Sequence, residues 1–169
     1  MINSFRLPKS IESDPRASQM LCALTANGKL LWPGGTVNVP EAQLNSALRE
    51  VLLAVHHAGR VVRGLEKAEQ KLATEARGQG MADRKSGVTR GVRVSRLLVL
   101  TNDGAERFYR QVESLLRRHA PRVIAVRLAI DAKGLGEMLY CPGRMVRLLL
   151  IEHKAAVGAV LLGLADQLA

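Results

Sequence analysis

The 169 residues carry a net charge of +10 and 47% of them are apolar, so the chain is long enough to fold around one proper core. A domain this basic favours a polyanionic partner, nucleic acid or an anionic membrane, and the alternative is a solubilising surface charge. Aromatic residues make up only 3% of the chain, which argues against stacked single-stranded bases as the main ligand. No run reaches the roughly 18 apolar residues of a membrane span. Cys22 and Cys141 share no motif, which favours reduced thiols in an intracellular protein.

Residues 1–39 are expected to form an N-terminal extension. The first twenty residues mix Pro, Ser and charged residues without a period, so they are expected to be mobile unless a partner holds them. Two short apolar runs, residues 20–24 and 30–32, flank Asn27-Gly28, which is a strong signal for a tight turn. This pattern predicts a small hairpin inside the extension.

Residues 40–169 are expected to form the domain. Pro40 suits the first position of a helix whose apolar stripe continues to residue 55 and which ends at Gly59. A short strand over residues 60–63 and a helix over residues 65–77 follow. Residues 78–94 are rich in Gly and basic residues and are predicted to form an inserted flexible loop.

The centre of the chain predicts a strand, a helix and a second strand. Apolar residues 96–101 end at Asn102-Asp103-Gly104, a helical pattern runs to Pro121, and a second apolar run covers residues 123–130. Such a unit forms a right-handed parallel crossover. A short helix over 132–140, a strand over 145–151 and a helix over 154–168 complete an α/β fold, a three-layer α/β/α sandwich with about four strands.

Catalytic and metal-binding patterns are not evident in the sequence. The four histidines show no metal-ligand spacing with one another or with the cysteines. Asp103 follows a buried strand, where open α/β sheets often bind ligands. However, Asp103 and Glu106 also have the spacing of a helix cap, which is the favoured interpretation. We therefore expect no enzyme activity, no metal and no cofactor.

Four segments carry a resemblance to a known family: residues 57–67 (HAGRVVRGLEK), 97–103 (LLVLTND), 135–137 (LGE) and 145–152 (MVRLLLIE). They resemble, in order, segments of the kink-turn RNA-binding ribosomal proteins, a family that includes the L-seven-Ae and L-thirty-e proteins. The bacterial YlxQ-like branch is nearest, because residues 64–67 are similar to its Gly-x-Glu tetrad. The resemblance covers roughly residues 44–165 and implies the same α/β/α fold.

The resemblance implies RNA contacts at the start of the helix from residue 65 and at two nearby loops. By position, the implied contacts are Arg60, Arg63, Gly64, Glu66, Lys67, Arg127 and Arg144. The cations would bind phosphates, Gly64 would allow close backbone approach, and Glu66 would touch a base. Glu66 and Lys67 stand where the family has Asn and Glu, and Gln70 stands where it has a lysine.

The basic loop is expected to make a second RNA contact through Arg84, Lys85, Arg90 and Arg93, with a solvated linker as the alternative. The expected function is therefore non-catalytic binding of structured RNA, rRNA first, by a ribosomal or ribosome-associated assembly protein. Its expected partners are RNA and ribonucleoprotein subunits, without a membrane or a small-molecule substrate. The expected location is the cytoplasmic ribosome, or alternatively the mitochondrial matrix. Two other hypotheses stay open: a protein-interaction module in a large complex, and a small ligand-binding domain or enzyme acting at Asp103.

Overall fold

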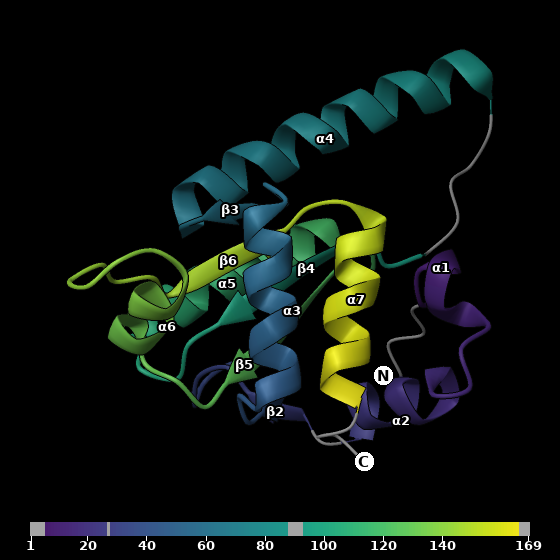
Figure 1. The fold of residues 1–169 in the computed structure, drawn as a ribbon. Helices are drawn as coiled ribbons and strands as arrows, with labels where there is room; N and C mark the ends of the chain where they lie inside the picture. Colours follow the sequence, from purple (N-terminus) through teal and green to yellow (C-terminus); the bar gives the residue numbers. More distant parts are fainter. Residues whose placement is uncertain (1–5, 27, 88–92, 166–169) are drawn as a thin grey trace.

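The fold has three layers with a mixed sheet in the middle (Figure 1). The structure is a computed structural model that describes residues 6–26, 28–87 and 93–165. In those ranges the chain forms seven helices and six strands, and the strand order is β1-β2-β5-β4-β6-β3. The α/β fold class is thus confirmed, with two more strands than the sequence predicted. None of the helices in the described ranges is long and apolar enough to span a membrane.

Strands β4 (Arg96–Leu100) and β5 (Val123–Leu128) form the centre of the sheet. They are parallel, in register from Arg96 opposite Val123 to Leu100 opposite Arg127, and α5 (Glu106–His119) connects them. The predicted crossover unit is therefore confirmed. On the far side of β4, β6 (Leu148–Ile151) and then β3 (Val61–Arg63) each pair antiparallel with the preceding strand.

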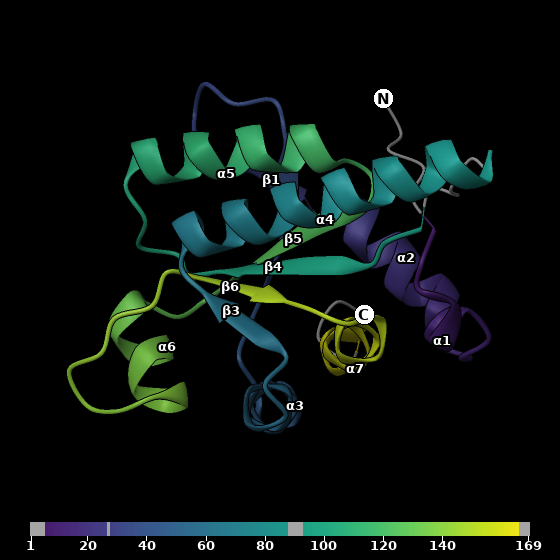
Figure 2. The same cartoon turned by 90° about the horizontal axis from the view of Figure 1, so that it is seen from above.

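The two faces of the sheet are covered by different helices (Figure 2). One face packs against α3 (Ser46–His57), α6 (Ala132–Leu139) and α7 (Lys154–Ala165), and α1 (Lys9–Glu12) and α2 (Ala17–Ala26) join this layer through α7. The other face packs against α4 (Leu65–Ser86) and α5. The alternation of strand residues between the two apolar clusters produces this layering.

The N-terminal segment is built differently from the sequence prediction. Residues 17–26 form α2, so the hairpin predicted across residues 20–32 is wrong; Asn27 lies outside the described residues. Met20 and Leu24, one helical turn apart, are buried in the core cluster that contains α7. The short strand β1 (Gly28–Leu30) instead pairs antiparallel with β2 (Asn38–Ala42), and β2 pairs parallel with β5.

The start of α3 also differs from the prediction. Pro40 lies in β2 opposite Gly28 and does not open a helix. The helix begins after Asn45, whose side chain accepts a hydrogen bond from Leu48 N at 2.8 Å. This side-chain cap satisfies one of the free amides of the first turn, so it fixes the start of the helix at Ser46, six residues after the proline.

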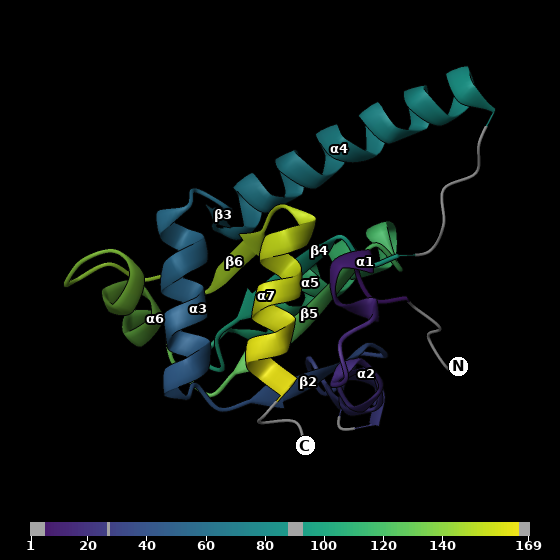
Figure 3. The same ribbon diagram turned by 45° about the vertical axis from the view of Figure 1, so that its right-hand side comes forward.

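The predicted flexible loop over residues 78–94 is wrong for most of its length. Helix α4 continues to Ser86 and projects beyond the sheet (Figure 3). No residue of its last ten is buried among those whose side chains are described, and a Cβ at Gly78 or Gly80 would meet nothing within 4 Å. Residues 88–92 of the predicted loop, including Arg90, lie outside the described residues.

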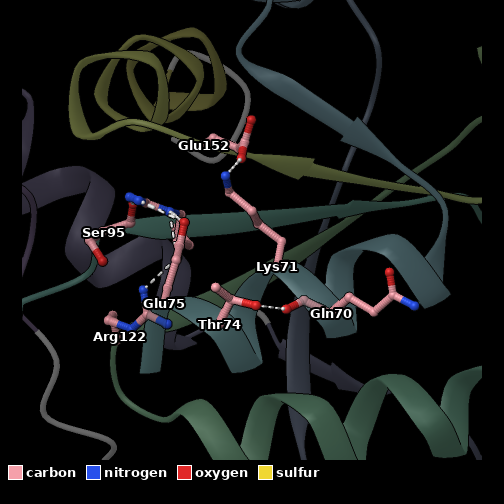
Figure 4. Close-up of polar contacts among 8 residues, drawn as sticks. Gln70, Lys71, Thr74, Glu75, Ser95, Arg122 and Glu152 are labelled. Carbon is pink, nitrogen blue, oxygen red and sulfur yellow. Dashed lines mark hydrogen bonds and ion pairs between the residues drawn. The ribbon is translucent and has the colours of Figure 1, made fainter. Parts of the chain in front are cut away.

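Glu75 fixes α4 against the sheet (Figure 4). Its carboxylate accepts hydrogen bonds from Arg96 at 3.1 Å and from Arg122 at 2.9 Å, the residues where β4 begins and just before β5 begins. Burial alone would raise the pKa of Glu75, but the two guanidinium groups lower it overall. On the same helix, Lys71 pairs with Glu152 at 3.2 Å. Two contacts with separate parts of the sheet therefore set the direction of α4.

Glu113 is a buried carboxylate that ties the β1–β2 loop to α5. It accepts hydrogen bonds from Trp32 Nε1 at 2.8 Å and from the backbone amides of Thr36 and Val37, each at 2.7 Å. The residue is only 6% exposed. Burial by itself would raise the pKa of Glu113, but these hydrogen bonds, with Arg117 nearby, lower it overall below its usual value of 4.5.

Replacing Glu113 by Gln should therefore destabilise the fold. We expect the free energy of unfolding to fall by about 2 kcal/mol at neutral pH, because hydrogen bonds to a buried charge are lost. A group with a lowered folded-state pKa stabilises above its unfolded pKa and loses that effect as the pH falls through the folded value. The difference from the wild type should thus shrink below about pH 4.5. Urea unfolding followed by the fluorescence of Trp32, the one tryptophan, measures this.

The matched control is Glu50→Gln, an exposed α3 carboxylate that makes no ion pair in the described ranges. Its unfolding free energy should stay within about 0.5 kcal/mol of the wild type. A Glu113→Gln deficit that did not change with pH would show that the carboxylate charge is not what holds the loop.

Candidate nucleic-acid interface

Four loops meet at the edge of the sheet where β3, β4 and β5 end. Gly64, Leu148, Leu100 and Arg127 lie in one row across the strands, since Gly64 N donates to Leu148 O at 2.9 Å and Leu100 pairs with both Leu148 and Arg127. The segments that follow β3, β4 and β5 and the segment that precedes β6 therefore share this edge, which we call the carboxyl edge. Figure 2 shows the starts of α4 and α5 and the loop after α6 on the same side of the molecule.

Arg63 and Arg144 come together at this edge around Tyr140. The Arg63 guanidinium lies 4.8 Å from the centre of the Tyr140 ring, a cation–π contact. Burial raises the pKa of Tyr140, and the charges of Arg63 and Arg144 oppose that rise. Arg144 belongs to the same loop as Tyr140, and its backbone amide donates to Cys141 O at 3.2 Å. Two residues far apart in the sequence thus belong to one charged surface.

The start of α4 adds backbone donors to this surface. Gly64 has a φ of +93°, a conformation that L side chains rarely adopt, and it turns the chain directly from β3 into α4. Glu66 and Lys67 are exposed in the first turn. Free amides and the helix dipole make such a terminus favourable for an anion.

Gly136 allows the loop of residues 140–147 to approach α6. A Cβ at this position would overlap the carbonyl oxygen of Arg144 and lie 2.6 Å from its carbonyl carbon. Gly136 is itself buried. The close approach that this glycine permits therefore determines where Arg144 sits.

Arg147 is a cation at this edge that the sequence analysis missed. Its carbonyl accepts a hydrogen bond from Thr101 N at 3.1 Å, which joins the start of β6 to the end of β4. Its side chain is exposed, and its charge contributes to the lowered pKa of Asp103. The sequence analysis placed Arg147 inside the strand predicted over residues 145–151, whereas β6 begins one residue after it, at Leu148. The available signal was the unbroken apolar run Leu148–Ile151 that directly follows the arginine.

Other predicted contacts are placed elsewhere. Arg60 is exposed before the first residue of β3, so it lies at the opposite end of that strand from Arg63. Arg127 is internal: its guanidinium pairs with Glu41 at 2.9 Å, donates to the carbonyls of Leu30 and Leu31, and lies 5.3 Å from the ring centre of Tyr109. The structure therefore does not bring Arg60, Arg63, Arg127 and Arg144 onto one face.

The residues predicted to form the second RNA contact are likewise dispersed in the structure. Arg93 donates to Leu7 O at 3.0 Å and pairs with Glu12 at 2.9 Å, so it holds the N-terminal segment. Arg84 and Lys85 belong to the projecting end of α4. Arg90 lies outside the described residues.

The Asp103 carboxylate makes hydrogen bonds within the fold. Its Oδ1 accepts hydrogen bonds from Thr101 Oγ1 at 2.8 Å and from Ala132 N at 3.1 Å. Burial would raise its pKa, but these bonds and Arg147 lower it overall. The predicted cap of α5 is wrong, because Ala105 precedes that helix without a side-chain cap and Asp103 binds the start of α6 instead. Among the described residues no group of three or more His, Cys, Asp or Glu is placed to hold a metal ion.

Comparisons with known proteins leave the function open. No protein-family model and no curated protein matches the sequence. Among solved structures the chain is similar to a protein with unknown function from Bacillus halodurans C, at 16% identity and a TM-score of 0.48. The match covers 73% of this chain and 100% of that one. A likeness this distant supports no argument about function.

Replacing Gly136 by Ala should displace the loop of residues 140–147. We expect the free energy of unfolding to fall by about 1–3 kcal/mol, because the added methyl meets backbone that cannot rotate away. Hydrogen exchange should rise in residues 140–147 and stay unchanged in β4. The control is Gly78→Ala in α4, where a methyl meets nothing within 4 Å and should stabilise the helix by up to about 1 kcal/mol. Equal effects of the two substitutions would contradict this account of the loop.

Proposed function

We propose that the chain binds structured RNA without catalysing a reaction, as a ribosomal or ribosome-associated protein with rRNA as its target. The observation that carries the proposal is the set of cations at the carboxyl edge, which we call the basic edge: Arg63, Lys67, Arg144 and Arg147. None of them forms a salt bridge in the part of the chain that the structure describes. Unpaired cations around a helix N-terminus suit phosphate groups.

The carboxylates near the basic edge do not cancel this charge by direct pairing. Asp103 is engaged with Thr101 and Ala132, and Asp131 accepts a hydrogen bond from Gly134 N at 2.6 Å as the cap of α6. By contrast, cations inside the fold such as Arg96 and Arg127 each have a carboxylate partner. Charge is therefore neutralised where it supports the fold and left available at the edge.

The arrangement suits a folded RNA better than a flexible single strand. The cations come from two separate segments, the turn from β3 into α4 and the loop of residues 140–147 before β6, so they can reach phosphates of more than one strand. Glu66, exposed in the first turn of α4, is the group placed to accept a hydrogen bond from a base. Enzyme activity at Asp103 has less support, because the neighbouring cavity is lined by Asn102 and not by Asp103.

Crosslinking the protein to RNA in cells and sequencing the adducts should recover a discrete rRNA segment. The folded segment should then bind in vitro with an affinity that falls with salt, with a slope of log affinity against log salt of about −3, as expected when a few phosphates are neutralised. The variant Arg63→Ala/Arg144→Ala/Arg147→Ala should bind about 10- to 100-fold more weakly at low salt and reduce the slope by about 2.

The matched control removes the same charge from other surfaces. Lys9, Arg60 and Lys154 are exposed and make no salt bridge in the described ranges, and none of them lies at the basic edge. Their triple Ala variant should change affinity by less than about threefold, apart from the general effect of net charge. Equal losses in the two triple variants would show unspecific attraction, and an absence of enriched RNA would favour a protein-interaction module.

A further inference from the structure

A crevice of about 410 Å³ opens at the carboxyl edge where the N-terminal strands join the central ones. Its walls come from the middle of β1, from the ends of β2 and β5 and from Asn102, which follows the end of β4. The lining residues are Lys29, Glu41, Ala42, Gln43, Asn102, Arg127, Leu128 and Ala129. This volume lies within the range of small-ligand sites, and the position is where open α/β sheets place ligands.

The charged wall of the crevice is held in place by the fold. Glu41 and Arg127 are directly opposite on β2 and β5, and their side chains pair at 2.9 Å. Lys29 approaches Glu41 from β1 at 3.0 Å, while its own side chain is 70% exposed. Because Arg127 already balances Glu41, Lys29 can turn to an entering anion without leaving the carboxylate unpaired.

The crevice lining also includes two side-chain amides. Neither Asn102 nor Gln43 uses its carboxamide in a hydrogen bond within the described residues, and both are exposed. A carboxamide presents a donor and an acceptor side by side, a pattern that matches the edges of nucleobases. Ala42 and Ala129 add small apolar surfaces to the lining. The crevice thus combines a cation, two amides and apolar side chains.

The crevice continues the surface to which the RNA-binding role is assigned. Asn102 follows Thr101, whose amide donates to Arg147 O at 3.1 Å, so the two sites share the end of β4. From β6 to β5 there are two strand spacings, roughly 10 Å. One strand of RNA that touches Arg147 can therefore reach the crevice.

We propose that this crevice binds a single nucleotide, with its base edge against the amides of Asn102 and Gln43 and its phosphate against Lys29. If the nucleotide belongs to a bound RNA, this proposal rests on the proposed function. A free nucleoside monophosphate presents the same chemical groups. Recognition by amides and a cation needs no aromatic platform, in keeping with a chain that is only 3% aromatic.

The test uses the full chain and the rRNA segment recovered by crosslinking, with 4-thiouridine or 6-thioguanosine placed at single positions. We expect one position to give an adduct that mass spectrometry maps to residues 41–43 or 101–102. The variant Gln43→Ala/Asn102→Ala should lower the yield of this adduct at least fivefold and weaken RNA binding by about tenfold. The control Gln111→Ala, an exposed α5 amide outside the crevice lining, should change neither.

A second arm titrates the four nucleoside 5′-monophosphates into the protein and follows binding by NMR. Binding that Gln43→Ala/Asn102→Ala and Lys29→Ala each weaken at least fivefold supports the site even if no RNA binds, in which case the proposed function fails and the crevice takes a free nucleotide. If RNA binds through the basic edge but no adduct maps to the crevice and no monophosphate binds, the nucleotide site is refuted while the proposed function stands. If neither RNA nor a monophosphate binds, both are refuted.

Discussion

The complete burial of β4 is the constraint on which the rest of the molecule depends. Leu97, Leu98, Val99 and Leu100 are each 0% exposed, and successive residues face opposite layers. Burying one such side chain contributes about 1.5–3 kcal/mol, so this strand is stable only when both faces are covered. Helices α4 and α5 therefore cover one face of the strand, and α3 and α7 cover the other. This burial also leaves polar side chains little room except at the ends of the strands, which is why the candidate sites lie there.

The elements that the sequence predicted well are those whose apolar pattern is local and strong. The crossover of β4, α5 and β5, the short β3 and the late β6 all follow from runs of Val, Leu and Ile bounded by turn residues. The prediction for the N-terminal segment was wrong for the opposite reason. The helix of residues 17–26 is fixed by burial of Met20 and Leu24 against distant parts of the chain, while β2 is fixed by pairing with β5 and β1 by pairing with β2. No pattern within forty residues contains that information.

Helix α4 shows a second limit of local patterns. Its last ten residues contain two glycines, Gly78 and Gly80, and Gly87 follows the helix, so the composition of this stretch suggested a loop. Among the residues of this stretch whose side chains are described, none is buried and so none marks it as helical. It continues the direction already set by Glu75 and Lys71, because extending a helix costs far less than starting one. Helical structure here follows from what precedes the segment and not from its own residues.

The candidate interface was predicted in part, and the division has a physical reason. Arg63, Gly64, Lys67 and Arg144, which the resemblance predicts as RNA contacts, lie together at the carboxyl edge. Arg93 and Arg127 do not contribute, because a guanidinium has several donors and the fold supplies carbonyls and carboxylates that bind them. From the sequence alone, an arginine that is paired inside the fold cannot be distinguished from one that is exposed at the surface.

The N-terminal strands explain why Arg127 is one of the paired arginines. By adding β2 beside β5, the chain brings Glu41 opposite Arg127 and removes this arginine from the exposed surface. The same addition places Lys29 and Gln43 around the crevice and leaves their side chains accessible. One pairing therefore neutralises a charge inside the fold and forms a crevice beside it, so the segment that a family-based view treats as an extension is part of the surface on which binding would depend.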